Sequence, residues 1–140
     1  MNLRSTLLTW ASLAIVLMVG LSAAAWQYGN DSHADTWGGP NIRIQMSEQG
    51  GTVEFSCAHG TMLEPVKPDA SGLFSVAGTY TPEHGGPIRK DETASDLPAT
   101  YKGRVRGDTM HLEIILPGEA TQPPPFTLTR GGGGKLMKCR

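Results

Sequence analysis

Apolar and polar residues alternate with a period of two along most of the chain after residue 37. This period is typical of β-strands that have one buried and one exposed face. Ile42, Ile44 and Met46, for example, alternate with Arg43 and Gln45. The pattern predicts strands at residues 42–46, 53–57, 74–80, 99–105, 110–116 and 126–128. Two shorter segments, 62–66 and 136–139, complete a predicted count of seven or eight strands.

Short turns rich in Gly, Pro and Asp separate these segments, as at residues 47–51, 68–72 and 106–109. Consecutive strands joined by tight turns form an antiparallel meander, and its apolar face must be covered. We therefore expect an all-β domain that curls into a small barrel, with a β-sandwich as the alternative. A closed barrel is favoured because closure removes exposed sheet edges. The bulky candidates for its interior are Phe55, Phe74, Tyr80, Tyr101, Met110 and Phe126.

The N-terminus has the features of a secretory signal peptide. Arg4 supplies a basic start, residues 7–21 are almost wholly apolar, and Ala23-Ala24-Ala25 ends the stretch. Residues 1–25 are therefore predicted to be removed on export, which places the chain in the periplasm or outside the cell. The alternative is an uncleaved membrane anchor formed by residues 7–25, since this stretch just reaches the roughly 20 residues that span a bilayer.

After cleavage, residues 26–36 are predicted to form a flexible leader and residues 37–140 a single β domain. The signal peptide contains one charge, Arg4, so its loss changes the net charge from −1 to −2. This balance argues against a nucleic-acid partner, which usually requires a strong basic excess.

Cys57 and Cys139 are the two cysteines of the chain. Two cysteines in an oxidising compartment most often pair, so we expect a disulfide, with two separate buried thiols as the alternative. The bond would close a loop of 82 residues (139 minus 57). The chain-entropy description assigns such a loop on the order of 4 kcal/mol of stabilisation.

The glycine run at residues 131–134, followed by Lys135, is not a phosphate-binding loop. That motif needs an earlier glycine where Thr129 stands, and a Ser or Thr where Leu136 stands. A hairpin turn is the simpler explanation of the glycines. No nucleophile elbow or zinc-protease motif occurs either, so no catalytic residue and no cofactor is assigned.

A metal site can be built from His59, His84 and Glu83. Cys57 and His59 share strand parity, and the loop would bring in Glu83 and His84. Imidazole, thiolate and carboxylate groups suit zinc or copper. The alternative is that Cys57 forms the disulfide and that the glycine-flanked histidines bind turn backbone.

Two features are candidates for contact with a ligand or partner. Lys102, Arg104 and Arg106 form a basic row on one face of a predicted strand, where the alternatives are a solvated face or docking of an acidic partner. Residues 82–98 form a long polar loop that contains Arg89 and Lys90. Loops longer than about 12–15 residues are usually functional or disordered.

Several sequence blocks resemble a family of small exported bacterial proteins to which no activity is attached. These blocks are Trp37-Gly38-Gly39, Cys57-Ala58-His59-Gly60-Thr61, Pro82-Glu83-His84-Gly85-Gly86-Pro87-Ile88-Arg89 and Phe126-Thr127-Leu128-Thr129. The architecture also resembles lipocalin-like barrels, in which a Trp lies on the first strand and a late cysteine ties the chain end to the barrel. Asp35 departs from their Gly-x-Trp pattern. The resemblance implies a fold rather than a ligand.

We therefore expect a non-catalytic exported barrel that binds a small apolar ligand or a protein partner. The alternative is a secreted metal-binding protein or enzyme with a site near His59 and His84. An empty barrel interior would favour the apolar ligand, and a filled one the protein partner.

The exported protein is expected to begin at Trp26. Mass spectrometry of the protein recovered from outside the cytoplasm should give the mass of residues 26–140. A full-length mass recovered from the membrane fraction would favour the anchor instead.

Overall fold

The computed structural model describes residues 35–87, 91 and 95–139, which form one eight-stranded β-barrel. The strands are β1 (Asp35–Gly39), β2 (Ile42–Ser47), β3 (Gly50–Phe55), β4 (Ala58–Met62), β5 (Leu73–Pro82), β6 (Leu97–Arg106), β7 (Thr109–Ile115) and β8 (Phe126–Arg130). Across these residues, no helix is long and apolar enough to cross a membrane. The predicted signal peptide lies outside them. Asp35 and Thr36, the last residues of the predicted leader, belong to β1.

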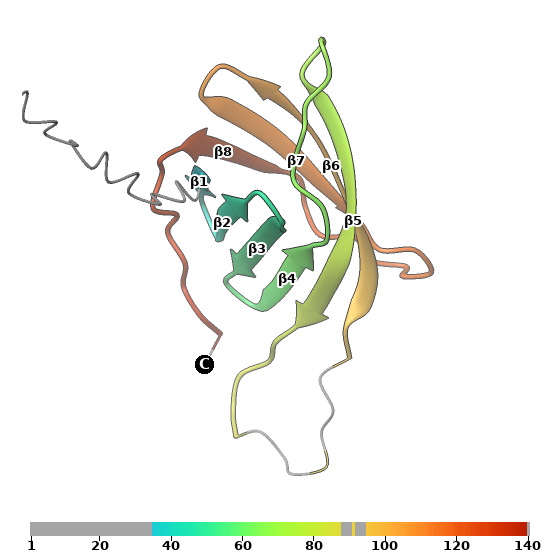
Figure 1. The fold of residues 1–140 in the computed structure, drawn as a ribbon. Helices are drawn as coiled ribbons and strands as arrows, with labels where there is room; N and C mark the ends of the chain where they lie inside the picture. Colours follow the sequence, from blue (N-terminus) through green and yellow to red (C-terminus); the bar gives the residue numbers. More distant parts are fainter. Residues whose placement is uncertain (1–34, 88–90, 92–94, 140) are drawn as a thin grey trace, which may run out of the picture. The chain divides into compact units, whose positions relative to one another are not determined.

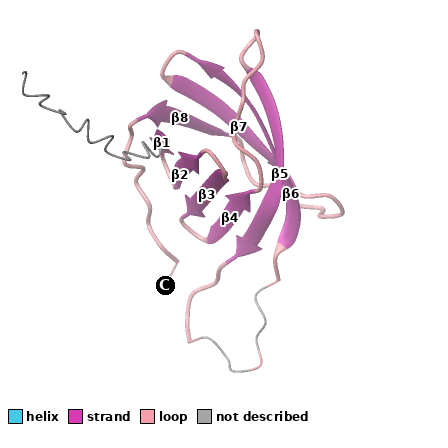
Figure 2. Cartoon of the chain, viewed as in Figure 1, coloured by secondary structure: helices cyan, strands magenta, loops and turns pink. Residues whose placement is uncertain are grey.

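Each strand pairs antiparallel with the next one along the chain, and β8 pairs with β1 to close the barrel (Figure 1). Strands and connecting loops account for the described residues, with no helix among them (Figure 2). The predicted all-β meander and its closure into a barrel are therefore confirmed. The sheet does not form the alternative β-sandwich.

Alternate residues of each strand point into the barrel, as the period of two predicts. Four of the predicted interior side chains are buried, namely Phe55, Phe74, Tyr101 and Met110. The other two, Tyr80 and Phe126, are half-buried and pack against the core. Burial of these apolar side chains supplies the main stabilisation of the fold.

Tyr101 occupies the interior because two neighbouring strands carry glycine where they face it. A Cβ atom on Gly60 would clash with the Tyr101 hydroxyl, and one on Gly78 would lie 2.8 Å from the Tyr101 ring. The hydroxyl donates a hydrogen bond to the Thr79 carbonyl oxygen (2.7 Å). Burial raises the pKa of Tyr101 well above its usual range, so the phenol stays neutral and keeps this hydrogen bond.

The strand predicted at residues 62–66 is wrong in position. The strand β4 covers Ala58–Met62 instead, and its inward residues are Ala58, Gly60 and Met62. Because Ala58 and Gly60 are small, the alternation of apolar and polar residues is weak here, and the sequence pattern does not indicate a strand. Pro65 and Pro68 follow β4 and lack the N–H that a continuing strand would need.

The C-terminal segment also differs from the prediction. Residues 136–139 form no strand, and the glycines form no hairpin, because Lys135 bridges Pro40 in a parallel sense. The segment instead crosses β1 so closely that a Cβ on Gly132 would lie 2.9 Å from the Gly38 carbonyl oxygen. Figure 1 shows it descending from β8 past β1 and β2. The glycine run therefore allows two backbones to meet.

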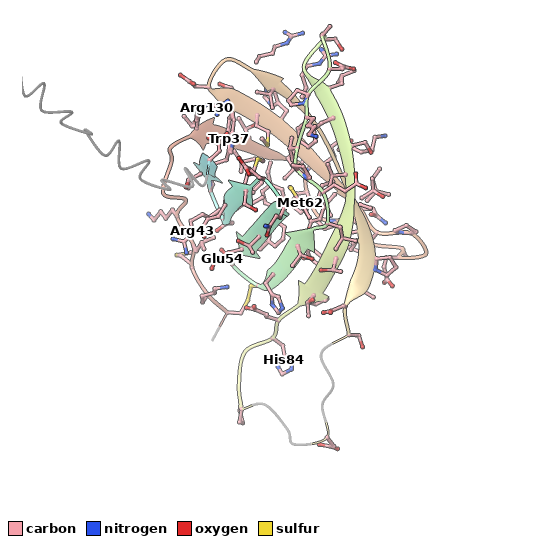
Figure 3. All side chains as sticks on the ribbon, in the orientation of Figure 1. Trp37, Arg43, Glu54, Met62, His84 and Arg130 are labelled. Atoms are coloured by element: carbon pink, nitrogen blue, oxygen red, sulfur yellow. A yellow bond between two sulfur atoms is a disulfide. The ribbon has the colours of Figure 1, made fainter. Side chains whose placement is uncertain are left out.

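The seam between β1 and β8 has two residue pairs, Trp37 with Arg130 and Gly38 with Thr129. The Arg130 guanidinium lies 4.4 Å from the centroid of the Trp37 ring and pairs with Asp35 (Figure 3). The Trp37 indole N–H donates to the same carboxylate (3.1 Å). Side-chain contacts therefore support a short backbone seam.

Replacing Gly60 by Ala should lower the free energy of unfolding by about 1–3 kcal/mol, because the added methyl would collide with both the Tyr101 hydroxyl and the Thr79 carbonyl oxygen to which it is hydrogen-bonded. Urea unfolding measures this change. Gly133→Ala is the matched control, since a Cβ there meets nothing within 4 Å. Equal stability of the two variants would contradict the packing of Tyr101 against Gly60.

Candidate functional site

Side chains of the protein itself occupy the barrel interior. Trp37 is 1% exposed and Tyr101 is 0% exposed. At one end, the Phe55 ring lies 5.3 Å from the Tyr80 ring and 5.5 Å from the Phe126 ring, centroid to centroid. A filled interior argues against a site for an apolar ligand in the middle of the barrel.

A groove of about 740 Å³ lies on the outer face of the barrel, over the strands β5, β6 and β7. Small-molecule and cofactor sites usually have volumes of about 300–1,000 Å³. Its lining includes Leu73 and Ser75 from β5, Lys102 and Arg104 from β6, His111 and Glu113 from β7, and Asp69, Pro125 and Thr127 at its margins. A smaller cavity of about 370 Å³ over the β2–β3 hairpin is lined without any charged side chain.

The groove side chains lie in two rows across the strands. In one row Leu73 is opposite Arg104, Arg104 is opposite His111, and His111 is opposite Thr127. The Thr127 hydroxyl is hydrogen-bonded to His111 Nδ1 (3.2 Å). In the other row Ser75 and Glu113 flank Lys102. Residues from four strands, β5 to β8, thus meet on one face only because the sheet pairs in this register.

Two basic side chains of the groove are not neutralised by ion pairs. Within the described residues, neither Lys102 nor Arg104 lies within 4 Å of a carboxylate. The Arg104 Nε atom is buried and lacks a hydrogen-bond partner there. The Arg43 Nε atom is buried in the same way, but its guanidinium pairs with Glu54 (Figure 3). The Arg104 Nε–H is therefore a buried donor for which the described residues supply no acceptor.

The carboxylate of Asp69, at one margin of the groove, is occupied by its own turn. Its Oδ1 atom accepts hydrogen bonds from the Ser71 hydroxyl (2.7 Å) and from the Ser71 and Leu73 N–H groups (2.8 and 2.9 Å). These bonds, chiefly that from Ser71 Oγ, lower the pKa of Asp69, and the charge of Arg104 adds to the effect. Asp69 thus fixes the turn that leads into β5.

The predicted contact residues separate into three groups. Lys102 and Arg104 both line the groove, whereas Arg106, the next outward residue of the predicted row, does not. Arg89 and Lys90 lie outside the described residues. The basic row therefore contributes two of its three members to the groove.

The predicted metal ligands are only partly brought together. His59 Nδ1 donates a hydrogen bond to Glu83 Oε1 (2.7 Å), and Lys138 Nζ lies 3.4 Å from Glu83 Oε2. His84 projects from the loop after β5, and its ring is hydrogen-bonded to the Gly85 carbonyl oxygen (3.1 Å; Figure 3). The described residues contain no cluster of three or more His, Cys, Asp or Glu side chains that could hold a metal ion.

The hydrogen bond from His59 and the charge of Lys138 lower the pKa of Glu83 below its usual 4.5. A lowered carboxyl pKa stabilises the fold above the unfolded-state value, and this contribution is lost as the pH falls below 4.5 through the folded-state pKa. The cluster thus joins β4, the end of β5 and the C-terminal segment, which is a structural role.

Cys57 and Cys139 lie at disulfide distance, with their Cα atoms 5.2 Å apart. The alternation predicts Cys57 on the inward side of a strand, but β3 ends at Phe55 and Cys57 is exposed in the bend that follows. The Cys139 N–H donates to the Ser56 carbonyl oxygen (3.1 Å) and thus holds the two segments together. Cys57 is therefore positioned to bond to Cys139.

No protein-family model matches the chain, and no curated protein or solved structure was found that is significantly similar to it. The closed antiparallel barrel is consistent with the lipocalin-like architecture that the sequence resembles.

Sequence reasoning missed most of the groove. It placed His111 and Glu113 on the outer face of a strand and Asp69 in a turn, but it connected none of them with a site, and it assigned no role to Leu73. Leu73 is 44% exposed. An exposed leucine at the start of a strand indicates a binding surface only when the residues beside it on the neighbouring strands are known. The register between strands supplies those neighbours.

A disulfide between Cys57 and Cys139 should leave no free thiol in the protein under denaturing, non-reducing conditions. Cys57→Ser and Cys139→Ser should each lower the free energy of unfolding by roughly 2–5 kcal/mol. Thiol titration and urea unfolding test the two statements. Two titratable thiols per chain would contradict the bond.

Proposed function

We propose that this protein is an exported, non-catalytic β-barrel that binds a protein partner through the outer groove over β5, β6 and β7. The observation that carries the proposal is the contrast between a filled interior and a groove with unneutralised basic side chains.

Export is part of this proposal and is supported by two features of the chain. The apolar N-terminal stretch ends in Ala23-Ala24-Ala25, which suits a signal peptidase. The cysteine pair lies at disulfide distance, and disulfides persist in oxidising compartments outside the cytoplasm.

A small apolar ligand bound inside the barrel is a weaker proposal than a protein partner bound in the outer groove. Tyr101, Trp37 and Phe55 already fill the space that such a ligand would need. A secreted metal protein or enzyme near His59 and His84 is also weaker, because His59 is engaged by Glu83 and the His84 ring by the Gly85 carbonyl.

The groove is tested with a displayed library of random peptides selected against the exported protein. Binding of the selected peptides should fall about tenfold or more in Leu73→Asp, because the apolar surface beside Arg104 becomes charged. Leu63→Asp is the matched control, since Leu63 is also an exposed leucine (62%) and does not line the groove. Thermal unfolding first verifies that both variants fold.

Equal binding to the unaltered protein and to Leu73→Asp would show that the peptides bind elsewhere. Equal weakening by Leu63→Asp would contradict a specific role for the groove.

A further inference from the structure

Lys102 and Arg104 stand at alternate positions on the outer face of β6. Residues two apart in a strand are separated by about 6.6 Å along the strand direction. A second extended chain has the same spacing between its own alternate residues. The two bases therefore match the side chains at positions i and i+2 of an extended segment laid along β6.

Three described bases are paired with acids, whereas no ion pair within the described residues involves Lys67, Lys102, Arg104, Arg106 or Lys135; of these five, Lys102 and Arg104 line the groove. Arg43 pairs with Glu54, Arg130 pairs with Asp35 and Asp108, and Lys138 pairs with Glu83. Lys102 and Arg104 have no such partner within the described residues, although the whole chain carries a net charge of −1. Positive charge is thus available in the groove of a chain that is slightly acidic.

The acids of the groove restrict which anion can bind. Asp69 lies at the margin with its carboxylate held by its turn, and Glu113 lies opposite Lys102 on β7. A surface with closely spaced negative charges, such as a phosphate polymer or an anionic membrane, would be repelled by both. An extended peptide avoids this repulsion because uncharged residues separate its carboxylates.

We propose that the groove binds an extended acidic segment of a partner protein, with carboxylates at alternate positions that pair with Lys102 and Arg104. This inference rests on the proposed function and names the chemistry of the partner. Arg104 forms the stronger contact, because a guanidinium can bind a carboxylate through two parallel hydrogen bonds. Leu73 provides apolar surface beside it for the methylene groups of the bound side chain.

The experiment uses two labelled peptides of identical composition and fluorescence anisotropy with the exported protein. One peptide has two glutamates separated by a single residue among threonines and valines, and the other has the two glutamates at adjacent positions, where they point to opposite faces of an extended chain. The alternating peptide should bind about tenfold more tightly, and its affinity should fall as salt screens the ion pairs. A lysine version of the alternating peptide should not bind.

Charge variants identify the residues that make the contact. Lys102→Gln should weaken binding of the alternating peptide roughly threefold, and the double variant with Arg104→Gln should weaken it more than tenfold. Glu113→Gln should strengthen it roughly threefold, since it removes the repelling charge beside Lys102. The control is a double variant with Lys67→Gln and Lys135→Gln, which removes the same amount of charge outside the groove. Its affinity for the alternating peptide should be nearly unchanged. If the double variant unfolds, the opposite effects of Lys102→Gln and Glu113→Gln on peptide affinity still test whether the groove charges make the contact.

Equal affinity for the two peptides would overturn the inference, as would equal weakening by the control pair. Binding to phosphatidylglycerol vesicles that depends on Lys102, without binding to the peptides, would replace the acidic segment by a membrane. If library peptides without acidic residues bind in a manner sensitive to Leu73→Asp, the groove stands and this inference fails. If no peptide depends on Leu73, the proposed function fails as well.

Discussion

The hydrogen bonds between β1 and β8 turn a meander of eight strands into a closed barrel. This seam has two residue pairs, so the Arg130 side chain, lying over the Trp37 ring and paired with Asp35, adds support where the backbone ladder is shortest. A cation over an aromatic ring contributes about 0.5–2 kcal/mol, according to how far it is desolvated. Closure matters beyond this energy because it removes the free edges of the sheet and fixes the volume of the interior.

The small interior explains why binding is assigned to the outer surface. Eight strands enclose a space that side chains can fill, and here large residues such as Trp37 and Tyr101 occupy it. Gly60 and Gly78 leave the room that the Tyr101 ring needs. Because packed side chains fill the interior, the groove that could hold a partner lies outside the barrel. It is formed by side chains that point outward from β5, β6 and β7.

The C-terminal segment strengthens the same closed form from outside. Its glycines approach β1 backbone to backbone, the Lys135 N–H donates to the Gly39 carbonyl oxygen, and Cys139 reaches Cys57 after a separation of 82 residues. Lys138 adds a contact to Glu83, which His59 also binds. Two of the residues that suggested a metal site in the sequence, His59 and Glu83, thus lie where the chain end is attached to the barrel.

The sequence by itself determined the all-β class, most of the strands and the outward direction of Lys102 and Arg104, because the period of two is a local property of side-chain polarity. It failed at β4, where the inward residues Ala58 and Gly60 are too small to mark a buried face. It also assigned a hairpin to the glycines near the C-terminus. In both places the residue type is set by a close approach between segments far apart in the chain.

Only the tertiary structure decided that Leu73, Arg104 and His111 form one surface. Their neighbourhood follows from the register of β5 with β6 and of β6 with β7, and a shift of one residue in either pairing would turn one strand's groove side chains to the other face of the sheet. That register is fixed by hydrogen bonds between strands and by closure of the barrel. The local alternation that predicts each strand carries no information about its partner's alignment.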